Sequence, residues 1–148
     1  MSASCFVDTN VFVYSRDASE PEKQPIAAQW VSELWRTRRG CVSTQVLNEY
    51  LVTVTQKLSP GLPWPDAWLD VESLLAWSPV SIDATLLRQA HAVRTEHDLS
   101  WWDALIVAAA LAAGSQWLLS EDFADGLRVG TLHVVNPFRH SPAAILGG

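Results

Sequence analysis

The sequence predicts a single α/β domain, a three-layer α/β/α sandwich with a central, mostly parallel sheet of about five strands. Short apolar runs alternate with amphipathic helical segments, and this alternation is typical of parallel strand pairing. The chain has 148 residues without linkers, repeats or low-complexity tracts, which favours one domain over 1–148. Apolar residues make up 49% of it, enough to bury a core.

In the first half of the chain, local signals mark most element ends. Asp8-Thr9-Asn10 contains turn and cap formers, Gly40 is a C-terminal helix stop, and Ser59-Pro60-Gly61 breaks a helix. In order, we expect a strand at Cys5–Val7, a short helix at 11–14, an amphipathic helix at 25–39, a strand at 41–42, a helix capped by Ser43 or Thr44 and running to 58, and a helix at 66–77.

In the second half, Asp83 and Ser100 are candidate helix caps and Gly114 ends the last long helix. The helix after Ser100 is apolar nearly all round, so we expect it to be buried. In order, we expect a strand at 78–82, a helix at 84–95, a helix at 101–113, a strand at Trp117–Leu119 and a strand at 131–135.

Charge and composition restrict the class of protein. Ten Lys and Arg residues against 16 Asp and Glu residues give a net charge of −6, which argues against phosphate binding by basic residues alone. A nuclease that gathers carboxylates around a divalent cation remains compatible with this balance. The longest apolar run, 104–113, is too short for a bilayer span of about 20 residues. With no secretory signal and no disulfide pattern, we expect a cytoplasmic protein without a membrane partner.

Four acidic residues are candidates for chemistry. Asp8 ends the first strand and Asp122 follows the fourth, so parallel neighbours would bring both to one sheet edge. Asp103 lies in the first turn of the buried helix, and Glu49 in the second turn of the helix after residue 43. Such carboxylates are the ligands that Mg²⁺ prefers. Each also has a structural interpretation, as a helix cap for Asp8 and Asp103 and as solvated surface for Glu49 and Asp122.

Two further features have two interpretations each. Arg36, Arg38 and Arg39 form one basic cluster, which contacts RNA phosphates or merely complements the dipole at a helix end. Trp64 and Trp68 share a stripe at helical spacing, which fits core packing or a docking face for a partner.

Five short motifs in order carry a resemblance to a known family: Phe6-Val7-Asp8-Thr9-Asn10, the segment 43–50, Ser100-Trp101-Trp102-Asp103-Ala104, Leu118-Leu119-Ser120-Glu121-Asp122-Phe123 and Val134-Val135-Asn136-Pro137-Phe138. Over nearly its whole length the chain resembles PIN-domain proteins, and more narrowly the VapC toxins of bacterial toxin–antitoxin pairs. The resemblance implies a PIN-like sandwich and a metal-dependent endoribonuclease. It also implies a homodimer that a small cognate antitoxin inhibits.

The resemblance also implies roles for single residues. Asp8 and Asp103 would be the principal ligands of Mg²⁺ or Mn²⁺, Glu49 would bind or assist a second ion or its water, and Asp122 would complete the pocket. Asn10 and Ser120 would be polar groups directly behind these ligands; the family often has threonine at the position of Ser120.

We therefore expect a toxin that hydrolyses RNA phosphodiesters at a carboxylate pocket. One alternative is a housekeeping RNA-processing nuclease of the same family without an antitoxin. Another is a non-catalytic, receiver-like module with an acidic pocket. That module would have a lysine late in the chain, whereas Lys23 and Lys57 are both early.

Overall fold

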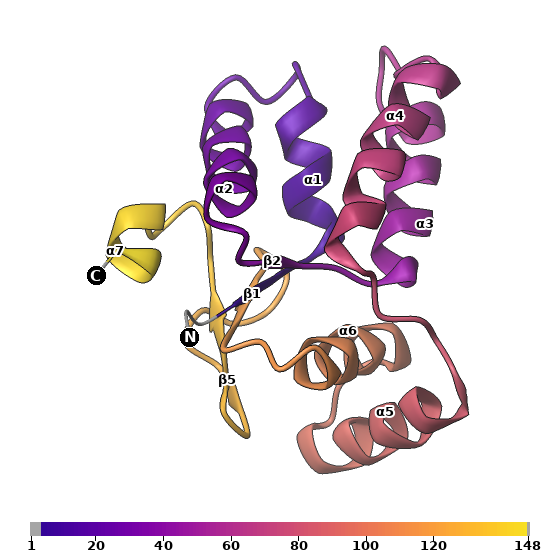
Figure 1. The fold of residues 1–148 in the computed structure, drawn as a ribbon, viewed down its shortest axis with the longest axis vertical. Helices are drawn as coiled ribbons and strands as arrows, with labels where there is room; N and C mark the ends of the chain where they lie inside the picture. Colours follow the sequence, from indigo (N-terminus) through magenta and orange to yellow (C-terminus); the bar gives the residue numbers. More distant parts are fainter. Residues whose placement is uncertain (1–3, 148) are drawn as a thin grey trace.

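The strands form one five-stranded sheet with the order β2-β1-β3-β5-β4 in the computed structural model, which describes residues 4–147 (Figure 1). β1 (Cys5–Val7), β2 (Gly40–Cys41), β3 (Trp117–Leu119) and β5 (Leu132–Val135) are parallel to one another, and β4 (Arg128–Val129) forms an antiparallel edge. The predicted sheet, mostly parallel with about five strands, is confirmed.

Helices pack on both sides of this sheet, which confirms the predicted three-layer sandwich. In Figure 1, α5 and α6 pack against each other below the strands, and α1 to α4 lie above them. The helical elements are α1 (Thr9–Arg16), α2 (Lys23–Thr37), α3 (Thr44–Val52), the π-helical turn η1 (Thr53–Lys57), α4 (Trp64–Leu74), the 3₁₀ turn η2 (Leu75–Trp77), α5 (Ala84–His97), α6 (Trp101–Ala112) and α7 (Pro142–Leu146).

Side-chain caps begin three helices where the sequence predicts them. Ser43, Asp83 and Ser100 each accept a hydrogen bond from the backbone N–H three residues later, at the starts of α3, α5 and α6. The residues of α6 from Ala104 to Ala110 are all buried, as its all-round apolar sequence predicts. The Ser100 cap therefore fixes Asp103 at the point where a core helix begins.

Two sequence predictions are wrong, one about a strand and one about the end of a helix. Residues 78–82 do not form a strand; Val80 makes a single parallel bridge to Ser43. Ser78 has a left-handed backbone (φ 53°) and Pro79 has no N–H to donate, so a continuous ladder is interrupted there. Gly40 is the first residue of β2 rather than a helix stop, because α2 already ends at Thr37 and its C-cap is Arg38, whose φ is 57°.

The fifth strand comes from a hairpin that the sequence did not predict. β4 has two residues and pairs with β5 across a turn in which Gly130 has φ 59°, a left-handed value that glycine adopts without strain. A run of two residues shows no periodicity, and for this reason the pattern of the sequence missed it.

The tryptophan stripe of α4 faces outward. Trp64 and Trp68 are 56% and 42% exposed, whereas Ala67 and Val71 on the same helix are buried. Core packing was the wrong interpretation for these two indoles, and the α4 surface remains open for a partner. Within residues 4–147, no helix has the length and apolarity needed to cross a membrane.

Candidate active site

The pairing of β1 with β3 brings two distant acidic segments to one edge of the sheet. Val7 is in register with Leu119, and the Asp8 N–H donates to the Leu119 carbonyl at 3.0 Å. Asp8 and Ser120, the next residues along each strand, are therefore adjacent, and the Ser120 hydroxyl donates to Asp8 Oδ2 at 2.7 Å. The position where parallel strands end is where open α/β sheets form their sites.

Asn10 joins the two carboxylates of this edge. Its Nδ2 lies 3.2 Å from Asp8 Oδ2, from Asp122 Oδ2 and from Ser120 Oγ, and its Oδ1 accepts from the Glu121 N–H at 3.2 Å. The Asp122 N–H donates to Ser120 Oγ at 3.1 Å. Asn10 and Ser120 thus orient both carboxylates, and the Thr9 N–H also donates to Asp8 Oδ1 at 2.8 Å. Asp8 is buried, whereas Asp122 is exposed.

Glu49 approaches the same edge from α3. Its Oε2 accepts from the Thr9 hydroxyl at 3.5 Å, and Thr9 is the residue after Asp8. Its Oε1 accepts from Gln45 Nε2 at 2.8 Å, one helical turn earlier. Glu49 points away from the apolar stripe of its own helix because that direction faces the end of β1.

Gln45 and Thr9 are site residues that sequence reasoning missed. The i,i+4 spacing of Gln45 and Glu49 on a predicted helix was the available signal for Gln45. Thr9 lies inside the Asp8-Thr9-Asn10 turn but carries no signal that separates it from an ordinary turn residue.

Asp103 reaches the edge from the start of α6. Ser100 caps its backbone N–H at 3.2 Å, but no residue among 4–147 donates a hydrogen bond to the Asp103 carboxylate. The reciprocal half of a capping box is therefore missing, and the carboxylate is not occupied by a capping role. Gln45 Nε2 also donates to the Trp102 carbonyl at 3.3 Å, which ties the start of α6 to α3 beside Glu49.

The charges of this edge act on one another. Burial raises the pKa of Asp8 to about 6, and the negative charges of Asp122 and Glu49 add to this effect against the hydrogen bonds from Ser120 and the Thr9 N–H. Burial also raises the pKa of Asp122, as do the charges of Glu121 and Asp103, whereas Asn10 lowers it. The four predicted carboxylates are thus electrostatic neighbours.

These carboxylates fit a hard divalent cation but do not form a closed cage. No three His, Cys, Asp or Glu side chains among residues 4–147 converge into a ready-made metal site. The donors are all carboxylate oxygens, and the charges of Asp122 and Glu49 on Asp8, and of Asp103 on Asp122, add to burial in raising the pKa of Asp8 and Asp122. Mg²⁺ keeps several waters and uses one or two protein carboxylates directly, so an open set of this kind suits it.

The arginine cluster lies at the amino ends of the strands, opposite the carboxyl ends where the acidic residues gather. The Arg39 carbonyl accepts from the N–H of Cys5, the first residue of β1, whereas Asp8 follows its last residue. Arg36 pairs with Glu33 on α2, and Arg39 donates to the Leu146 carbonyl at 2.8 Å and lies over the Trp117 ring. A contact of Arg36, Arg38 and Arg39 with RNA stays a prediction, and it would lie away from the carboxylates.

Comparisons with known proteins agree with this architecture. The family model of the PIN domain matches residues 5–124. The fold is similar to VapC20 of Mycobacterium tuberculosis, described as a sarcin-ricin loop cleaving toxin, with a TM-score of 0.61, 21% identity, and coverage of 88% of this chain and 99% of that one. It is also similar to a toxin–antitoxin complex from Klebsiella pneumoniae, with a TM-score of 0.56, 20% identity, and coverage of 90% and 98%. No curated protein sequence matches the chain.

Proposed function

The chain belongs to the PIN-domain family, and from this premise we propose that it is a metal-dependent endoribonuclease that acts as the toxin of a VapBC-type pair. The observation that carries the proposal is the joint fixation of Asp8 and Asp122 by Asn10 and Ser120 at the carboxyl edge of the sheet. Toxins among the proteins of similar fold support the same assignment. We place the activity in the cytoplasm, where cellular RNA is translated.

The cofactor in this proposal is Mg²⁺, with Mn²⁺ as an alternative. Asp8, Asp103 and Asp122 would hold it, and when bound it would neutralise charge on the scissile phosphate and lower the pKa of a water. The protein's own part is orientation: Ser120 and Asn10 fix Asp8 Oδ2, and Gln45 fixes Glu49 Oε1. Glu49 Oε2, held only by a long contact to Thr9, is available to accept a proton from the attacking water.

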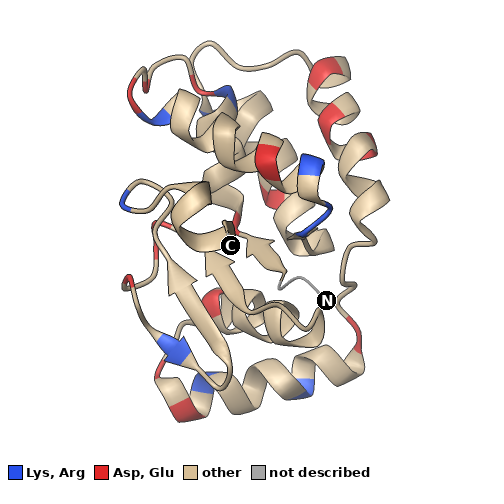
Figure 2. Ribbon diagram, turned by 60° about the vertical axis from the view of Figure 1, so that its left-hand side comes forward, with Lys and Arg blue, Asp and Glu red and all other residues tan. Residues whose placement is uncertain are grey.

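The electrostatics of the chain bear on how an RNA phosphodiester would reach the proposed site. Apart from the arginine cluster at the end of α2, the basic residues of the described chain are scattered over separate elements and do not gather into one stripe (Figure 2). A chain with a net charge of −6 therefore depends on the bound cation to attract a phosphodiester.

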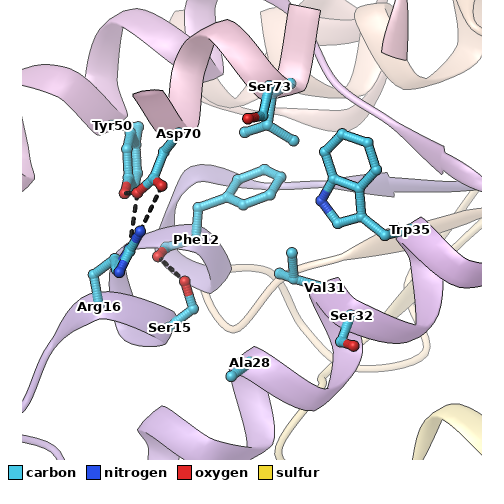
Figure 3. Close-up of a pocket in the computed structure, with 11 residues that line it drawn as sticks. Phe12, Ser15, Arg16, Ala28, Val31, Ser32, Trp35, Tyr50, Asp70 and Ser73 are labelled. Carbon is cyan, nitrogen blue, oxygen red and sulfur yellow. Dashed lines mark hydrogen bonds and ion pairs between the residues drawn. The ribbon is translucent and has the colours of Figure 1, made fainter. Parts of the chain in front are cut away.

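A small antitoxin and a second copy of the chain are the proposed partners. A groove of about 710 Å³ between α1, α2 and α4 has apolar walls that include Phe12, Val31 and Trp35 (Figure 3). At one end Arg16 donates to both carboxylate oxygens of Asp70, at 2.8 and 2.5 Å. Its apolar walls and the charged pair at one end suit an amphipathic antitoxin segment. The exposed α4 surface is the candidate for the homodimer contact.

The test compares wild type with Asp103→Asn on structured RNAs in Mg²⁺, in Mn²⁺ and in chelator. We expect cleavage by the wild type only, and none after chelation. Asp98→Asn is the matched control, because Asp98 is an exposed aspartate five residues earlier whose left-handed backbone (φ 53°) asparagine tolerates. Equal cutting by Asp103→Asn would contradict the proposal. Growth arrest on expression, relieved by Asp103→Asn, separates a toxin from a housekeeping nuclease.

A further inference from the structure

A second groove begins at the candidate active site. It has a volume of about 510 Å³ and lies between α3, η1 and the start of α6. Glu49 belongs both to this groove and to the carboxylate edge, so the two are continuous. The lining residues that carry the argument are Gln45, Glu49, Val52, Lys57, Ile82 and Trp102.

Trp102 supplies an exposed aromatic wall. It is 63% exposed, although α6 is otherwise the most buried helix of the fold, and it directly precedes Asp103. Val52 and Ile82, which also line the groove, are 44% and 42% exposed. An exposed indole beside a carboxylate site has the chemistry of a stacking platform for an unpaired base.

Gln45 supplies a buried acceptor without a partner. The residue is only 5% exposed, and its Nε2 donates to Glu49 Oε1 and to the Trp102 carbonyl. The Glu49 carboxylate and the Trp102 carbonyl are both acceptors, so the amide atom that faces them must be the nitrogen. The other amide atom of Gln45 is therefore the oxygen, Oε1. That oxygen has no hydrogen-bond partner among the residues described. A buried acceptor without a partner destabilises the protein, so an N–H donor entering the groove would bind favourably.

Lys57 supplies a positive charge at the other end. It is exposed and makes no ion pair with any residue of the described chain. It follows Glu49 by eight positions, across the end of α3 and the π-helical turn η1. The lining of the groove therefore combines Glu49 of the carboxylate edge, the exposed indole of Trp102 and a cation without an ion pair in the described chain. An indole together with a cation is the combination that binds a single nucleic-acid strand.

We propose that this groove binds an unpaired nucleotide beside the cleaved phosphodiester. The base stacks on the Trp102 indole, one of its N–H groups donates to Gln45 Oε1, and Lys57 contacts a neighbouring phosphate. Each of the four bases carries an N–H donor, so the groove selects unpaired over paired nucleotides rather than one base over another. The inference deepens the nuclease assignment and rests on it.

Binding of fluorescently labelled oligo-A, oligo-C and oligo-U, with Ca²⁺ in place of Mg²⁺, tests the stacking step. We expect Trp102→Ala to weaken binding of all three by about 5- to 150-fold, the effect of one lost base stack, and Trp102→Phe to retain most of the affinity. Leu87→Ala is the matched control, because Leu87 is an exposed apolar residue of α5 (43%) that lies outside the groove. Binding to an RNA duplex should not respond to Trp102→Ala.

A second variant tests the charge. Lys57→Gln should weaken binding and reduce the slope of log affinity against log salt by about 0.7, the value for one phosphate contact on a single strand. Unchanged binding by both Trp102→Ala and Lys57→Gln, or no measurable binding by wild type, would overturn the groove assignment. If wild type cleaves RNA while both variants bind as it does, the nuclease stands and the groove is wrong. If wild type does not cleave RNA in Mg²⁺ or Mn²⁺, the nuclease itself is wrong.

Discussion

The buried carboxylate of Asp8 makes a quantitative prediction for the metal-free protein. Its pKa rises from 3.8 to about 6 on folding, because burial and the charges of Asp122 and Glu49 disfavour the ionised form. The native state therefore binds a proton more tightly than the unfolded chain, and the free energy of unfolding falls as pH rises from about 4 to about 6. The rise in pKa from 3.8 to about 6 corresponds to a loss of about 3 kcal/mol, complete by about pH 7.

Urea unfolding in chelator, at a series of pH values, measures this loss against Asp8→Asn. We expect the difference in unfolding free energy, wild type minus variant, to fall by about 3 kcal/mol between pH 4 and pH 7 and to stay constant above. Other carboxylates, such as Asp125, have a lowered pKa in the fold and stabilise the protein more as pH rises. Their contribution is the same in wild type and variant, so it cancels in the difference. Mg²⁺ at pH 7 should stabilise wild type and not the variant. A difference that does not change with pH would refute the reasoning.

Three further substitutions test the fold and the site. Gly40→Ala places a Cβ on the Trp77 ring and should lower the urea-unfolding free energy by about 1–3 kcal/mol. Trp30→Phe removes the indole N–H that donates to two carbonyls, at 3.0 and 3.1 Å, and should cost about 1–3 kcal/mol in the same assay; a loss below about 0.5 kcal/mol would contradict that role. Asn10→Ala should lower cleavage about 10- to 100-fold with a near-native thermal midpoint, since it frees both carboxylates it orients.

Local chemistry explains the part of the fold that the sequence could predict. The caps at Ser43, Asp83 and Ser100 depend on one side chain and a backbone N–H three residues later, so nearby sequence determines them. The meeting of Asp8 with the segment at Ser120 depends on a long-range pairing, yet it follows from one rule: parallel neighbours end at the same edge.

The misses have a common physical origin in short strands and side-chain networks. β4 has two residues, and a strand of that length exists only because β5 supplies its hydrogen bonds. The Gln45 amide joins Glu49 to Trp102 across two helices, and that contact depends on how α3 and α6 pack. Element type could be read from residue order, whereas contacts that depend on helix packing could not.

The pattern of ion pairs connects the metal proposal with the groove proposal. Within residues 4–147, basic side chains neutralise acids elsewhere: Arg16 pairs with Asp70, Lys23 with Glu121 and Arg36 with Glu33. None of the four edge carboxylates takes part in an ion pair of the described chain, although the charges of Asp122 and Glu49 raise the pKa of Asp8 and that of Asp103 raises the pKa of Asp122. An external cation is then required before a phosphate can approach, and Lys57 can only hold a strand that the cation has already attracted. Chelation should therefore weaken RNA binding more than Lys57→Gln does. A larger loss of affinity from Lys57→Gln than from chelation would show that the groove binds RNA independently of the metal site.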